Sequence, residues 1–73
     1  LLVDDEPSIR RFLRVSLTGH GYTVTEAKNG LEAIDAMVSA RPDLVILDMG
    51  LPDISGLDVV RQAREWSTVP ILI

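Results

Sequence analysis

The chain has 73 residues, which is enough for one small domain and no more. It has no cysteine, so disulfide bonds and thiolate metal sites are excluded, and its 47% apolar and 25% charged residues exclude a disordered segment. The net charge of −4 argues against a nucleic-acid surface, and no apolar run reaches the length of a membrane span.

Both ends of the sequence lie inside apolar runs, residues 1–3 and 69–73. Because natural domains rarely begin and end within a strand, we expect these residues to be a piece of a larger protein. No signal peptide opens the chain, so we expect a cytoplasmic location. We expect the isolated 73 residues to be unstable, because the last run would form an exposed apolar edge strand.

Apolar runs predict strands at residues 1–3, 44–47 and 69–73, and the β-branched and aromatic residues 22–25 predict a further strand. Three helices are expected between them. The first begins at Pro7, the second at Asn29-Gly30, and the third at Ser55, where Asp58 completes a capping-box pattern.

Apolar residues at helical spacing predict the inner faces of these helices. They are Ile9, Phe12, Leu13 and Leu17 in the first helix, Leu31, Ile34, Met37 and Val38 in the second, and Leu57, Val60 and Ala63 in the third. The arginines of the first helix are assigned to its solvated faces: Arg10, Arg11 and Arg14.

The predicted order of elements is β-α-β-α-β-α-β. Strands that are separated by single helices pair in parallel, and right-handed crossovers place the helices on the faces of the sheet. The expected fold class is therefore α/β, with a doubly wound parallel sheet.

Acidic residues follow two of the predicted strands. Asp4, Asp5 and Glu6 come after the first strand, and Asp48 comes after the third. Ligands of doubly wound sheets bind outside the carboxyl ends of the strands. If these strands are neighbours, three carboxylates converge and repel one another, and a hard divalent cation such as Mg²⁺ would remove that repulsion.

Other interpretations of the acidic residues remain open. The residues from Asp4 to Glu6 could simply cap the first helix, and Asp48 could be a turn residue at the end of a strand. A phosphate-binding loop is absent, and Gly50 stands where a haloacid-dehalogenase-type phosphatase has its second aspartate.

The joint pattern is more specific than any of its parts. An acidic pair after the first strand, a hydrophobic strand that ends in Asp48, and a Leu51-Pro52-Asp53 turn before the Ser55-Gly56 start of a helix resemble the receiver domain of two-component response regulators. The resemblance covers the whole chain and implies a flavodoxin-like (CheY-like) sheet of strand order 2-1-3-4. Gly50 before the turn, with residues 10–14 and 64–70, is most similar to the potassium-operon regulators of the KdpE type, in the OmpR/PhoB class.

The resemblance implies that Asp48 is the phosphoacceptor and that a sensor histidine kinase donates the phosphoryl group from its phosphohistidine. Asp5 and Asp48 would be direct Mg²⁺ ligands, with the backbone carbonyl of Gly50, and Asp4 would act through a metal-bound water. The protein would be a signalling switch rather than an enzyme that turns over.

The resemblance also implies features that lie outside these residues. They are a Ser or Thr after the fourth strand, a Lys after a fifth strand, two further helices, and a DNA-binding output domain, with homodimer formation on phosphorylation as an option. The alternative function is a pseudo-receiver, which keeps the fold as a protein-interaction module and never takes phosphate.

Overall fold

The computed structural model describes all 73 residues, which form four short parallel strands and three helices. In chain order these are β1 (Leu2–Val3), α1 (Pro7–Gly19), β2 (Glu26–Ala27), α2 (Gly30–Ala40), β3 (Val45–Leu47), α3 (Gly56–Arg64) and β4 (Ile71–Leu72). No helix is both long enough and apolar enough to cross a membrane.

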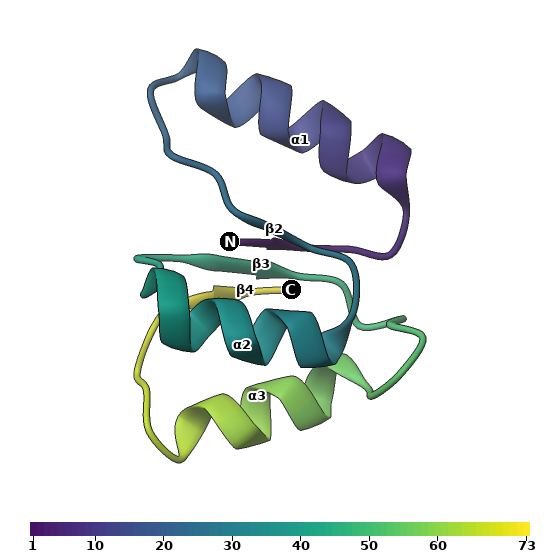
Figure 1. Ribbon diagram of the computed structural model, residues 1–73, viewed down its shortest axis with the longest axis vertical. Helices are drawn as coiled ribbons and strands as arrows, with labels where there is room; N and C mark the ends of the chain where they lie inside the picture. The colour runs from purple at the N-terminus through teal and green to yellow at the C-terminus, as the bar shows by residue number, and fades with distance from the viewer.

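The strand order is β2-β1-β3-β4, with every neighbouring pair parallel. Helix α1 lies on one face of the sheet, and α2 and α3 lie on the other (Figure 1). The α/β fold class and the strand order 2-1-3-4 are thereby confirmed. Because β1 and β3 are neighbours, their carboxyl ends lie side by side.

Alternation along the strands divides the sheet residues between the two faces. On one face, Val3 is paired with Ala27 and with Leu47, and Val45 is paired with Ile71. These residues belong to the core under α2 and α3. On the other face, Leu2 is paired with Glu26 and with Ile46, and Ile46 is paired with Leu72. These residues face α1. The core is completed by Ala33 and Met37 of α2 and by Val59 and Ala63 of α3.

The starts of the helices are as predicted. Pro7 occupies the first turn of α1. The side chain of Asn29 accepts a hydrogen bond from the Glu32 N–H at 2.8 Å, and that of Ser55 accepts one from the Asp58 N–H at 3.1 Å. These bonds satisfy backbone donors that the first turn of a helix leaves unpaired.

The prediction for the second strand is wrong in its position. The ladder bonds of β1 join the Leu2 N–H to the Thr25 carbonyl and the Asp4 N–H to the Ala27 carbonyl, so pairing begins only at the last of the predicted residues 22–25, and the strand itself is Glu26–Ala27. Helix α1 ends at Gly19, and Gly21 adopts a positive φ of 88°. The residues that follow are therefore used to return the chain from α1 to the sheet (Figure 1).

The predicted inner faces of the helices are partly wrong. In α2 the buried residues are Gly30, Ala33 and Met37, whereas Leu31 and Val38 are 59% and 60% exposed. In α3 the buried residues are Gly56, Val59 and Ala63, whereas Leu57 is exposed. Four of these six buried residues are Gly or Ala, because the helices approach each other and the sheet closely there.

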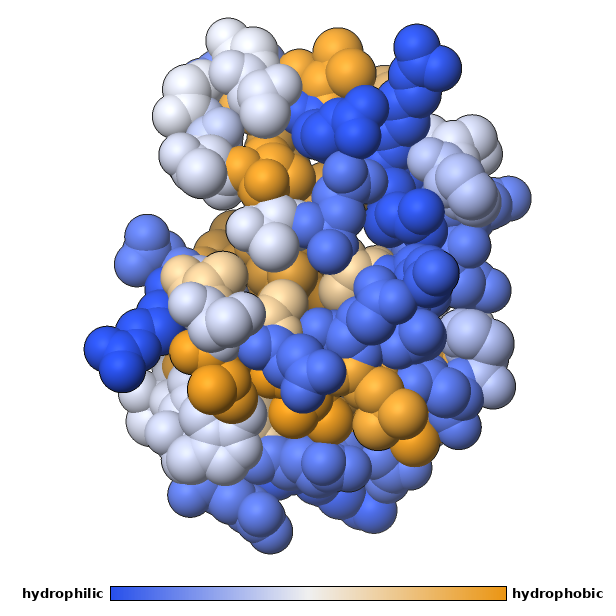
Figure 2. Space-filling model, viewed as in Figure 1, coloured by the Kyte–Doolittle hydropathy of each residue, from blue (hydrophilic) through white to orange (hydrophobic).

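The predictions for α1 also need correction. No residue of this helix is fully buried; Ile9 and Phe12 are exposed, and Leu13 and Leu17 are half-buried. Arg10 is not on a solvated face, since its side chain is 17% exposed and pairs with Glu26. The surface is hollowed between α1 and the rest of the molecule, with hydrophobic atoms in the hollow (Figure 2).

Candidate functional site

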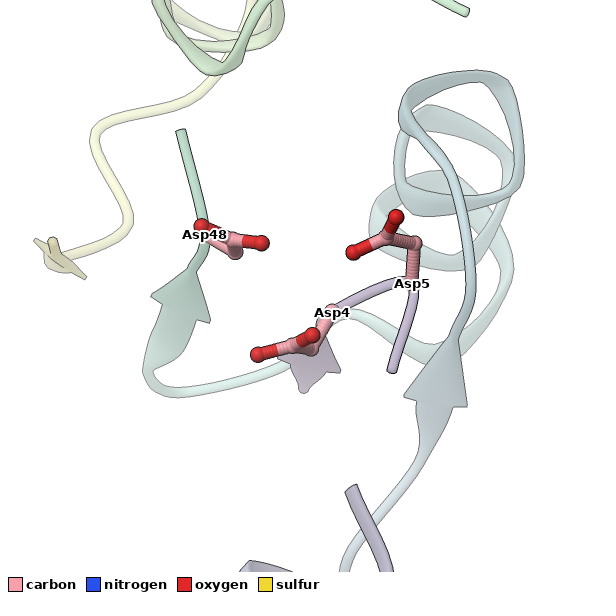
Figure 3. Close-up of side chains that lie close together, drawn as sticks. All are labelled: Asp4, Asp5 and Asp48. Carbon is pink, nitrogen blue, oxygen red and sulfur yellow. The ribbon is translucent and has the colours of Figure 1, made fainter. Parts of the chain in front are cut away.

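Three carboxylates meet at the carboxyl edge of the sheet. The Asp4 N–H bonds the Ala27 carbonyl at 3.1 Å and the Asp48 N–H bonds the Val3 carbonyl at 2.9 Å, so the parallel ladder fixes both aspartates at the ends of their strands. With Asp5, they contribute one oxygen each to a group whose atoms all lie within 4.8 Å of one another. The side chains point toward a common space (Figure 3).

The hydrogen bonds of these carboxylates are few. Asp4 Oδ1 accepts one from the Glu6 N–H at 2.9 Å, and Asp48 Oδ1 accepts one from the Gly50 N–H at 3.2 Å. Asp48 therefore also stabilises the turn after β3. The residue that precedes α1 is Glu6, and its side chain forms no capping hydrogen bond. The side chain of Glu6 therefore does not cap α1.

The donor set fits a hard divalent cation. All the oxygens come from carboxylates, two of the aspartates are partly buried, and Asp5 is exposed, so water can complete an octahedral shell. A cavity of about 300 Å³ borders the site and is lined by Asp4, Arg10 and Asp48 among mainly apolar residues. Asp4, Asp5 and Asp48 could hold Mg²⁺ at this position.

An arginine network supports the loop after β1, and the sequence did not reveal it. Arg10 donates a hydrogen bond from Nη1 to the Asp4 carbonyl at 2.7 Å and lies 3.5 Å from Glu26. Arg14 bonds the same carboxylate of Glu26 at 2.9 Å. Glu26 is an acidic residue in β2 and could have indicated this network, but it lies outside the strand that was predicted at residues 22–25.

The contacts of Asp53 were also not predicted from the sequence. Its carboxylate accepts hydrogen bonds from the N–H groups of Gly30 at 2.8 Å and Leu31 at 2.9 Å, at the start of α2. Burial raises the pKa of Asp53, but bonds from the backbone N–H groups of Gly30, Leu31, Ile54 and Asp53 itself outweigh burial, so the pKa lies below its ordinary value. The partners are more than 20 residues earlier in the chain, beyond the reach of any local pattern.

The geometry agrees with what is found in known proteins. The response regulator receiver domain family matches residues 1–73, and the chain belongs to this family. It is 49% identical over 73 residues to the transcriptional regulatory protein KdpE of Mycobacterium tuberculosis, which confirms the resemblance to the KdpE type. The match covers all of this chain but 32% of KdpE, so the chain spans about a third of the length of this curated relative.

Two solved structures of the response regulator TrrA are similar to this chain. TrrA of Thermotoga maritima in complex with Mg²⁺–BeF has a TM-score of 0.83 at 47% identity, over 88% of this chain and 56% of that one. TrrA in complex with the histidine kinase ThkA has a TM-score of 0.87 at 44% identity, over 96% of this chain and 61% of that one. Both confirm the CheY-like fold.

Proposed function

We propose that this receiver domain accepts a phosphoryl group on Asp48 in a Mg²⁺-dependent reaction, with the phosphohistidine of a sensor histidine kinase as donor. The observation that carries the proposal is the approach of the Asp4, Asp5 and Asp48 oxygens to within 4.8 Å of one another. The TrrA complexes with Mg²⁺–BeF and with ThkA support the choice of cation and partner.

The chemistry requires an oxygen nucleophile on Asp48. One carboxylate oxygen forms a bond to phosphorus while the N–P bond of the phosphohistidine breaks, and the imidazole retains that electron pair. A divalent cation at the site would offset the negative charge on the transferring oxygens. Asp5, Asp48 and the Gly50 carbonyl would be its direct protein ligands, and Asp4 would act through water. The Gly50 N–H orients the Asp48 carboxylate.

The protein would act as a switch, not as an enzyme that turns over. A phosphoryl group adds negative charge at the edge of the sheet and biases a two-state element. KdpE is a transcriptional regulatory protein, so we infer a transcriptional output through a separate DNA-binding domain and a cytoplasmic location. The net charge of −4 agrees that these 73 residues do not contact DNA.

The experiment is chemical phosphorylation of the protein at its native length. Incubation with Mg²⁺ and an acyl phosphate should give an adduct that hydroxylamine removes, and intact-mass measurement should show one added phosphoryl group. The adduct should be absent from Asp48→Ala and present in Asp58→Asn, which changes an exposed aspartate on α3. A wild-type protein that forms no adduct would instead be a pseudo-receiver.

A further inference from the structure

The loop between β3 and α3 carries two of the proposed metal-site groups, Asp48 and Gly50. Two short-range contacts close it: the Gly50 N–H bonds Asp48 Oδ1, and the Gly56 N–H bonds the Met49 carbonyl at 3.3 Å. Gly56 approaches so closely that a Cβ there would lie 2.9 Å from Met49 Cα. These contacts shape the loop but do not attach its middle to another element.

Asp53 supplies that attachment. Within residues 50–54, the hydrogen bonds to another element of the fold are the two that the Asp53 carboxylate accepts, at 2.8 Å from Gly30 and 2.9 Å from Leu31. Both donors are first-turn N–H groups of α2, which have no partner inside the helix. A carboxylate also interacts favourably with the positive end of a helix.

An apolar contact adjoins these hydrogen bonds. A side chain at Gly30 would collide with Ile54 and would lie 3.0 Å from Cγ2 of Val59. The lack of a side chain at Gly30 therefore lets the loop lie directly against the start of α2. The contact between the loop and the start of α2 combines two hydrogen bonds with close packing, so it constrains both the orientation of the loop and its distance from α2.

We propose that Asp53 is a positioning residue for the metal site: by bonding the first turn of α2, its carboxylate fixes the loop that carries Gly50 and the phosphoacceptor Asp48. The structure shows the attachment of the loop to α2, whereas the expected effect on metal binding rests on the proposed function. Asp53 need not touch the cation or the phosphoryl group.

The test compares two variants that weaken the same helix terminus. Asp53→Asn keeps the size of the side chain but places an amide donor opposite a backbone donor. Asn29→Ala removes the bond from the Glu32 N–H and leaves the Asp53 contacts in place. Amide hydrogen exchange across residues 49–54 without metal, and Mg²⁺ binding by titration calorimetry, should be measured for both variants and for wild type at native length.

We expect Asp53→Asn to increase exchange in residues 49–54 and to weaken Mg²⁺ binding by about tenfold, as is typical when a group that orients a metal ligand is lost. Asn29→Ala should leave both quantities near wild type, although it also loses a cap of α2. Equal effects of the two variants, or no effect of Asp53→Asn on exchange, would overturn the inference. Absence of an acyl-phosphate adduct in wild type would overturn the proposed function separately, since hydrogen exchange does not depend on phosphorylation.

Discussion

Helices α2 and α3 cover their face of the sheet differently from the way α1 covers the opposite face. The former contribute buried residues, including Ala33, Met37, Val59 and Ala63, to a shared core. Helix α1 has no fully buried residue, and its Phe12 is 62% exposed. Polar groups help to hold α1 to the sheet, because Arg10 and Arg14 both bond Glu26.

The contrast indicates that stability is concentrated on one side of the sheet. A face with close packing resists opening, whereas a helix held by few buried contacts opens more readily. The acidic site lies at the edge where both sides meet: Asp4 and Asp5 precede α1, and Asp48 begins the loop that Asp53 attaches to α2. Substitutions on the two faces should therefore differ in size and even in sign.

The largest effect is expected for Leu47→Ala, in the core under α2 and α3. Leu47 is buried and its truncation leaves a cavity, so the free energy of unfolding should fall by about 3 kcal/mol. Ile46→Ala, one residue earlier on the α1 face, should cost about half as much because Ile46 is only half-buried. Urea unfolding of both variants, made in the protein at its native length, measures the difference, and equal losses would contradict the contrast.

A smaller loss is expected for Gly30→Ala, where α2 meets the loop before α3. The added methyl group would collide with Ile54, so the loop or the helix must shift at a cost of about 2 kcal/mol. Urea unfolding measures the loss. A Gly30→Ala variant as stable as wild type would show that the packing at this contact is looser than described.

Glu26→Gln tests how much the polar contacts of α1 contribute. The substitution removes the charge that Arg10 and Arg14 share, and we expect a loss of about 1 kcal/mol, at the upper end for ion pairs with partial exposure. Amide exchange should rise in α1 and not in α2 or α3. Asp58→Asn is the matched control, because its pair with Arg61 is exposed and 3.9 Å long. If both variants lose the same stability, the Glu26 network is not what holds α1.

The smallest effect should be a gain. Gly19 is the last residue of α1 and a Cβ there would meet nothing within 4 Å, so Gly19→Ala should stabilise the domain by about 0.5 kcal/mol through reduced backbone freedom. Thermal unfolding would detect this as a small rise in Tm. Substitution of glycine by alanine thus stabilises the domain at residue 19 and destabilises it at residue 30. A lower Tm for Gly19→Ala would show that α1 is packed more tightly than its exposure indicates.

Several parts of the site could be predicted because they depend on local rules. The acids after β1 and β3 are placed by the end of each strand, and the caps Asn29 and Ser55 act on N–H groups three residues away. The contacts of Asp53 and Glu26 could not be predicted in this way. Their partners lie on other elements, so those bonds exist only once the sheet and helices have assembled.

The sequence by itself determined the order of strands and helices, the α/β class and the residue types at the carboxyl edge, because periodicity, capping and turn residues act within a few positions of the chain. Only the tertiary structure decided which residues of each helix are buried, where β2 begins, and which acids are bound to other elements. The physical reason is that spacing fixes how often an apolar residue recurs, whereas contact with neighbouring elements fixes which side is covered. Close approach then selects Ala33 and Val59 over the larger Leu31 and Leu57.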